Sequence, residues 1–185
     1  MTKVFKGRYT AQAEGPFVVF IIGMRVNRLW ALHKWIPTAM AMGPMLHTLY
    51  THQQEKGFMG AHTFLSWRGV MLVQYWRSFE DLERFARSKD DPHLKAWQRF
   101  YKAVGSDGSV GIFHETYMIQ PGQYEAIYGN MPIFGLAAAT QHVTIAERRQ
   151  SARGRIGGED APAMSPPITP PIAPATAPEV AEIMR

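Results

Sequence analysis

The residues of this sequence best suited to chemistry are two histidines, His93 and His114, which stand 21 positions apart. His93 follows a proline at the predicted start of a helix, and Trp97 and Phe100 follow on the same helical face. A neutral imidazole beside flat, apolar side chains suits the axial ligand of a haem iron. Taken by itself, His93 is explained more simply as a helix-start histidine next to two aspartates.

His114 lies in the middle of a predicted strand, residues 109–119, in which alternate positions are mostly apolar. We expect its side chain to be buried, and a buried histidine needs a polar partner or a chemical task. A pKa near neutrality suits a general acid-base. Considered alone, the position is better explained by a core histidine bonded to a neighbouring strand.

Other site chemistries have little support in the sequence. The chain has seven histidines and no cysteine, which excludes disulfides and thiolate ligands. His47 and His52 are five positions apart, so they do not share a helical face as zinc ligands do. The sequence contains neither a glycine-rich phosphate loop nor a Gly-x-Ser-x-Gly nucleophile motif. A non-haem metal site is therefore not indicated.

The elements that must position the two histidines follow from hydrophobic periodicity. Strands are predicted over residues 17–24, 60–67, 70–76 and 109–119. A helix over 28–54 should be kinked or broken, because Pro37 and Pro44 each remove a backbone donor. Two helical segments, the first capped by Ser78, should lie between the third and fourth strands. The order β-α-β-β-α-β predicts a ferredoxin-like α+β fold.

The remaining parts of the chain are predicted to be peripheral. Residues 1–15 should form a loose arm or a short edge strand, and residues 123–128 a short extra strand. Both faces of the main sheet carry apolar residues, whereas helices can cover one face only. We expect a second copy to cover the other, giving a homodimer closed as an α+β barrel. A large ligand in that space is the competing explanation.

Composition indicates one folded domain, residues 1–147, followed by a tail at 148–185. The tail is rich in proline and alanine and is predicted to be disordered. The net charge of +5 is scattered and no nucleic-acid motif accompanies it, so no nucleic-acid partner is expected. Arg25 and Arg28 close the longest apolar run, so no spanning helix and no membrane partner are expected. The N-terminus lacks a signal-like core, which favours a cytoplasmic protein.

The stretch from Tyr75 to Leu136 resembles the aldoxime dehydratase family. The resemblance rests on Trp76–Arg84, His93-Leu94, His114-Glu115, Tyr124-Glu125, and an Asn-x-Pro-x-x-Gly-Leu end at 130–136. That family consists of haem enzymes of the dimeric α+β barrel superfamily, which convert an aldoxime into a nitrile and water. The resemblance implies that haem b is the cofactor, that His93 is the proximal iron ligand, and that His114 is the distal acid-base.

The chain also departs from that family. Those dehydratases are roughly twice as long, with two ferredoxin-like halves, and carry a distal serine that residues 23–27 lack. Arg25 or Asn27 would have to polarise a small nitrogen-oxygen substrate in its place. Trp76, together with Trp97 and Phe100, would wall the haem. The whole chain also resembles an uncharacterised bacterial family labelled monooxygenase-like.

Two alternatives therefore stay open beside the haem lyase. One is a cofactor-independent or haem-degrading monooxygenase of the same fold, in which Trp67, Trp76, Trp97 and His114 line an apolar pocket. The other is a non-catalytic dimeric module that binds a small molecule and recruits a partner through its proline-rich tail.

Overall fold

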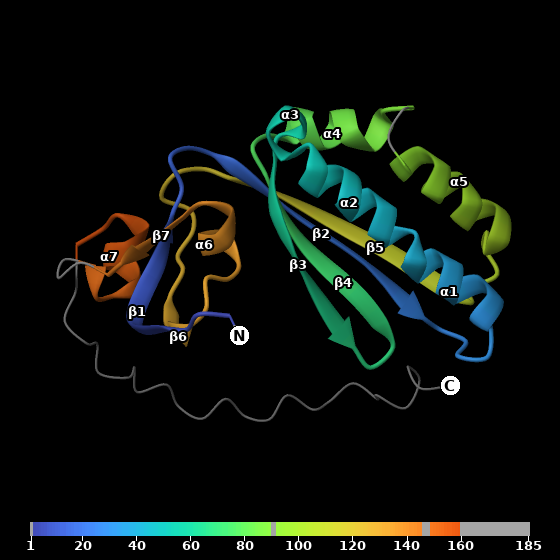
Figure 1. Ribbon diagram of the computed structural model, residues 1–185, viewed down its shortest axis with the longest axis horizontal. Coiled ribbons are helices and arrows are strands. Elements are labelled where there is room, and N and C mark those ends of the chain that lie inside the picture. The colour runs from blue at the N-terminus through green and yellow to red at the C-terminus, as the bar shows by residue number, and fades with distance from the viewer. Residues whose placement is uncertain (1, 90–91, 146–148, 160–185) are drawn as a thin grey trace, which may run out of the picture.

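The chain folds into two antiparallel sheets of unequal size (Figure 1). This computed structural model describes residues 2–89, 92–145 and 149–159, without the side chains of residues 92, 93 and 95–97. The larger sheet has four strands in the order β3 (Phe58–Ser66), β4 (Gly69–Trp76), β2 (Phe17–Val26) and β5 (Val110–Ile119). All neighbouring pairs are antiparallel. This strand order confirms the predicted ferredoxin-like α+β fold.

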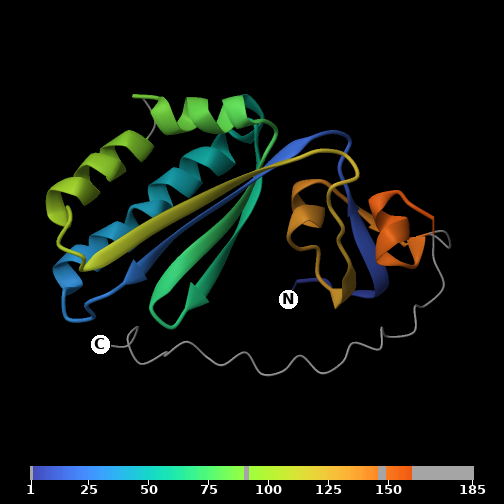
Figure 2. The same ribbon diagram turned by 180° about the vertical axis from the view of Figure 1, so that it is seen from behind.

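The helices of the two crossovers cover one face of this main sheet, as both ribbon views show (Figures 1 and 2). The first crossover contains α1 (Leu32–Met40), α2 (Met42–Thr51) and α3 (Gln53–Lys56), and the second contains α4 (Phe79–Arg87) and α5 (Pro92–Ala103). The helix expected over 28–54 is thus broken, with Pro37 inside α1. Gly57, at φ 68°, ends α3 in a left-handed conformation that suits glycine.

The main core lies between the sheet and these helices. Its buried members are Val18, Met45, Leu49, Phe58, Trp76, Leu82 and Phe85. Trp76 is fully buried, and its Nε1–H donates to the Oε1 of Gln74 at 3.0 Å. Because the indole is large and its polar atom is satisfied, Trp76 anchors β4 against both crossovers.

The start of α4 is held by a buried carboxylate. Ser78 caps the helix by accepting the Asp81 N–H at 3.1 Å. The Asp81 carboxylate accepts from Arg77 Nε at 2.8 Å and from Arg84 at 2.9 Å. Burial by itself would raise the pKa of Asp81, but Arg77, Ser78 and Arg84 outweigh it and lower that pKa. The stretch Trp76–Arg84 therefore has a structural explanation.

A second sheet joins the N-terminal segment to residues 128–144, which no local pattern in the sequence predicted. Its order is β6 (Tyr128–Met131), β1 (Phe5–Gln12) and β7 (Gln141–Thr144), with α6 (Leu136–Ala139) beside it. The expectation of a loose arm or edge strand over 1–15 was wrong, because β1 is the central strand of this sheet. The strand expected over 123–128 lies instead at Tyr128–Met131.

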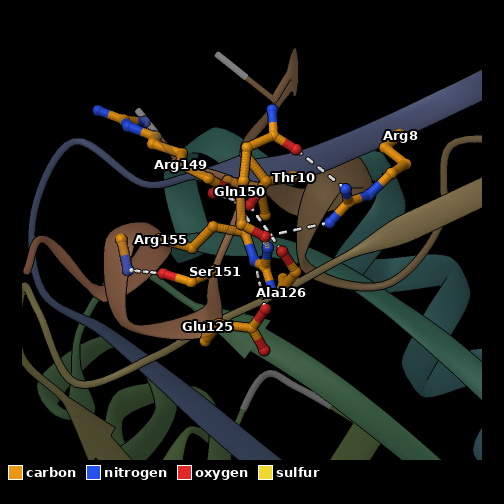
Figure 3. Close-up of polar contacts among 10 residues, drawn as sticks. Arg8, Thr10, Glu125, Ala126, Arg149, Gln150, Ser151 and Arg155 are labelled. Carbon is orange, nitrogen blue, oxygen red and sulfur yellow. Dashed lines mark hydrogen bonds and ion pairs between the residues drawn. The ribbon is translucent and has the colours of Figure 1, made fainter. Parts of the chain in front are cut away.

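The chain remains structured beyond residue 148, where a disordered tail was predicted to begin. Helix α7 (Ala152–Ile156) packs on the small sheet through two arginines (Figure 3). Arg8 and Arg155 both donate to the backbone carbonyl of Gln150, at 3.1 and 2.7 Å, and Arg155 pairs with Glu125. The rest of the predicted tail, residues 160–185, lies outside the described residues.

None of the helices in the described ranges has the length and apolar character needed to cross a membrane.

Candidate functional site

His114 lies on the face of the main sheet that the helices cover. It pairs across the sheet with Ile22 of β2, so the two side chains share a face. Its ring centroid is 5.7 Å from that of Phe20. The expectation of a buried histidine was wrong, because β5 is an edge strand and leaves His114 exposed. Within the described part of the chain, its imidazole has no hydrogen-bond partner and is open to a ligand.

A hollow lies beside His114, between the sheet and the helices α2 and α4. Its walls are Phe20, Ile22, Met42, Met45, Leu49, Gln74, Trp76, Leu82, Phe85 and Ala86. The enclosed cavity is small, about 30 Å³, and His114 is not among the residues that line it. Phe20 links this hollow to His114, since it lines the one and contacts the other. An apolar group that reached the Phe20 ring would therefore lie close to an accessible imidazole.

Gln74 is a residue of this site that reasoning from the sequence did not identify. It is 4% exposed, and its amide is the polar side-chain group that β4 adds to an otherwise apolar wall. The Trp76 indole holds its Oε1, which orients the amide. The available signal was a lone amide within the apolar run 70–76. A buried amide in such a wall suits recognition of a carbonyl or hydroxyl group.

The residues predicted to wall a haem separate in the structure. Trp76 lines the hollow, whereas Phe100 packs against a different cluster, formed by Met24, Val26, Val104 and Val110. The backbone of His93 lies in the first turn of α5, as predicted. The side chains of His93 and Trp97 lie outside the described residues, so the assignment of His93 as an iron ligand stays a prediction.

Arg25 and Asn27 do not join His114 in one chain. Arg25 is three positions from Ile22 along β2, so its side chain points to the opposite face of the sheet from His114. Asn27 lies past the strand end, where its Nδ2 donates to the Gly108 carbonyl at 3.1 Å. Strand alternation thus separates Arg25 from His114, and its position beyond the strand end separates Asn27 from it.

Trp67 also lies away from the hollow. It occupies the turn between β3 and β4 and is 90% exposed. The hollow is therefore formed without Trp67, by Trp76 together with side chains of β2, β4, α2 and α4, and its role as a monooxygenase pocket stays a prediction.

The opposite face of the main sheet is covered at one end only. There α6 and the loop before it dock on β3, because the Gly135 N–H donates to His62 Nε2 at 2.8 Å and Phe134 packs on the His62 ring. Burial lowers the pKa of His62, and it raises the pKa of Tyr75 and of Tyr128, whose hydroxyl groups lie near Gly135. The motif at 130–136 is thus a docking segment.

The other end of that face is open. Phe113 is 42% exposed there, and Phe64, whose ring meets Phe134 of the docking segment edge-on, is 39% exposed. This is the surface on which a second copy was predicted to pack, and the homodimer stays a prediction.

The described residues do not by themselves form a site for a planar cofactor. The imidazole of His114 is accessible, but Trp76 and Phe100 lie in different clusters and the hollow is small. The haem cofactor therefore stays a prediction.

Comparisons with known proteins agree with the fold and add a family. The sequence profile of the family described as "Monooxygenase af470-like" matches residues 17–136. The protein "Monooxygenase af470" of Aspergillus fumigatus is 29% identical over 154 residues, which cover 70% of this chain. These residues cover 53% of the fungal protein, so the chain spans about half the length of that relative.

Solved structures show a similar fold at low sequence identity. An aldoxime dehydratase (OxdRE) in complex with butyraldoxime matches with a TM-score of 0.52 and 16% identity, over 80% of this chain and 42% of its own. A dimeric protein of unknown function with a ferredoxin-like fold, from Bacteroides fragilis, matches with a TM-score of 0.39 and 10% identity. That match covers 55% of this chain and 96% of the other. At such identities the likeness concerns the fold alone.

Proposed function

Because the chain belongs to the monooxygenase af470-like family, we propose that it oxidises a small apolar substrate with molecular oxygen in the hollow beside His114. The observation that carries this proposal is the position of His114. Its imidazole is accessible, and it contacts Phe20 in the wall of an apolar hollow that contains one buried amide, Gln74. A base next to an apolar pocket is the minimum that such an oxidation requires of the protein.

The reaction that fits these groups starts from an acidic C–H bond. His114 removes a proton from a CH₂ group beside a carbonyl, and the resulting carbanion reduces oxygen to a carbon-bound hydroperoxide. Loss of water from the hydroperoxide gives a ketone, so CH₂ and O₂ become C=O and H₂O without an external reductant. Gln74 would hold the substrate carbonyl, and the apolar walls would keep the carbanion away from water.

Oxygen uptake tests this proposal directly. An oxygen electrode would record consumption with 2-indanone, whose CH₂ groups lie next to a carbonyl, for the native protein and for His114→Gln. We expect the variant to lose roughly 10²-fold or more of the turnover, which is the usual contribution of one positioned base. His47→Gln is the matched control, because His47 is an exposed histidine of α2 outside the hollow. Equal turnover in native protein and His114→Gln would remove His114 from the mechanism.

A haem-dependent reaction on a nitrogen-oxygen substrate is the second candidate. It is favoured by the placement of His93 on α5 and His114 on β5, two elements of one helix-and-sheet layer. The likeness to an aldoxime dehydratase over 80% of the chain is consistent with it. When bound, haem would supply an iron that binds the substrate nitrogen. His93 would hold the haem, and His114 would give a proton to the departing hydroxyl.

A haem titration separates the two candidates. Absorption spectra of ferric and dithionite-reduced protein would be recorded for the native chain, His93→Ala and His114→Ala. The haem candidate predicts a one-per-chain endpoint that His93→Ala abolishes and His114→Ala retains, with nitrile formation from butyraldoxime lost in both. Weak binding that is equal in all three proteins would leave the oxygenase proposal alone.

A further inference from the structure

The most exposed large apolar side chains of the described residues gather at one end of the main sheet. Trp67 is 90% exposed, Leu65 85% and Trp30 79%. Leu65 and Trp67 belong to the tip of the β3–β4 hairpin, and Trp30 to the loop between β2 and α1. Both ribbon views place this tip and this loop at the same end of the molecule, away from the small sheet (Figures 1 and 2).

Arg68 joins these two segments. Its Nε donates to the Val26 carbonyl at 3.0 Å and its guanidinium to the Asn27 carbonyl at 2.8 Å. In return, the Val26 N–H donates to the Arg68 carbonyl at 2.6 Å. The hairpin tip is therefore hydrogen-bonded to the start of the loop that carries Trp30, so the two segments that carry the tryptophans are joined to each other.

Helix α1 extends the apolar surface. Leu32, Ile36 and Met40 are 51%, 39% and 70% exposed, and they follow one another at intervals of four residues. Side chains at this spacing lie on one face of a helix. The buried side of α1 is supplied instead by Trp35 and Ala39, which pack on the core. The helix thus presents an apolar stripe to solvent, next to the loop of Trp30.

The charges at this end are almost all positive. Arg28 and Arg68 lie within the two segments that carry the tryptophans, Arg25 pairs with Gly69 at the base of the hairpin, and Lys34, which pairs with Asp107, lies on α1. Four cations against one anion leave a net charge of +3. Within the described ranges, neither Arg25 nor Arg28 forms an ion pair, and Arg68 binds carbonyl groups only.

We propose that this end of the protein, which we name the Trp30/Trp67 tip, binds the surface of an anionic lipid bilayer. Tryptophan prefers the boundary between lipid and water, and arginines beside it are attracted to anionic headgroups. An apolar helical stripe next to cationic side chains is the arrangement of interfacial helices. Such attachment involves one leaflet and requires no spanning helix. The net positive charge selects a lipid surface over a second copy of this chain, which would present the same charge.

The test is sedimentation of the full-length protein with vesicles. Phosphatidylcholine vesicles would be compared with vesicles that also contain phosphatidylglycerol. We expect binding to the anionic vesicles, with a blue shift of tryptophan fluorescence. The double variant Trp30→Ser with Trp67→Ser should lose this binding, and Arg25→Gln with Arg28→Gln should weaken it about fivefold for each arginine.

Matched controls separate the tip from general surface effects. Met118→Ser with Ile156→Ser removes two exposed apolar residues elsewhere, and Lys3→Gln with Lys6→Gln removes one charge just before β1 and one within it. Both should bind like the native protein.

Absence of vesicle binding, or equal binding by all variants, overturns the proposal. The proposal is also overturned if the native protein is a dimer, the tryptophan variant is a monomer, and neither binds vesicles. The tip would then be an interface between copies. Circular dichroism checks folding, and the arginine variant gives an independent test should the tryptophan variant misfold.

Discussion

Replacing Asp81 by asparagine tests whether the Trp76–Arg84 stretch is structural. The Asp81 carboxylate is 5% exposed and accepts charge-assisted hydrogen bonds from Arg77 and Arg84. Each such bond contributes about 1.5–3 kcal/mol when its groups are buried. The two arginine side chains are 57% and 68% exposed, so water replaces part of what is lost. An asparagine amide would also point a donor at a guanidinium. We therefore expect Asp81→Asn to lower the free energy of unfolding by about 2–3 kcal/mol.

Urea denaturation measures this loss at pH 7. With a slope of about 2 kcal/mol per molar, the midpoint should fall by about 1 M or slightly more. Glu83→Gln is the control, since Glu83 pairs with Arg87 on the same helix but both side chains are largely exposed. It should cost less than about 0.5 kcal/mol. A loss in Asp81→Asn no greater than in Glu83→Gln would refute the reasoning.

The same experiment has a pH dependence with a defined sign. The pKa of Asp81 is lower in the folded protein than in the unfolded chain, so its stabilisation is present above the unfolded pKa. It is lost as the pH falls through the folded pKa. The difference between native protein and Asp81→Asn should therefore shrink in acid, while the Glu83→Gln difference stays small throughout.

Three further predictions follow from local geometry. Burial holds the pKa of His62 below 6.5, and its Nε2 accepts the Gly135 N–H. The stabilisation from neutral His62 is therefore present above pH 6.5 and is lost as the pH falls toward the folded pKa. Amide exchange of Gly135, corrected for its intrinsic rate, should accelerate in acid in the native protein and not in His62→Phe. Gly69→Ala would place a Cβ 2.0 Å from the Met24 carbonyl oxygen. The substitution should lower the urea midpoint by an amount equivalent to about 2 kcal/mol or more. An unchanged midpoint would contradict the close approach of β4 to β2 at this position. Arg155→Gln should free the segment around α7, seen as faster limited proteolysis there with the main sheet still protected, and an unchanged cleavage pattern would show that Arg155 does not hold this segment in place.

The main sheet was predictable because its signals are local. The apolar runs of β2 and β4, the proline breaks and the Ser78 cap each involve residues within a few positions of one another. Once four strands and two crossovers are identified, few antiparallel arrangements remain, and the ferredoxin-like order is among them.

The small sheet was not predictable in the same way. The partners of β1 lie in β6 and β7, so Tyr9 pairs with Tyr128 and Thr144 from the far part of the chain. No local pattern marks such pairing, and β1 alone looks like an edge strand. The docking of Gly135 on His62 is equally distant, since 73 positions separate the two residues.

By itself, the sequence determined the two histidines, the helix and the strand that carry them, and the order of the elements. Those features depend on spacing along the chain. Tertiary structure decided which faces they share: the alternation of β2 put Arg25 opposite His114, and the edge position of β5 left His114 accessible beside the hollow. A strand sends successive side chains to opposite sides, and only its neighbours decide which side is covered.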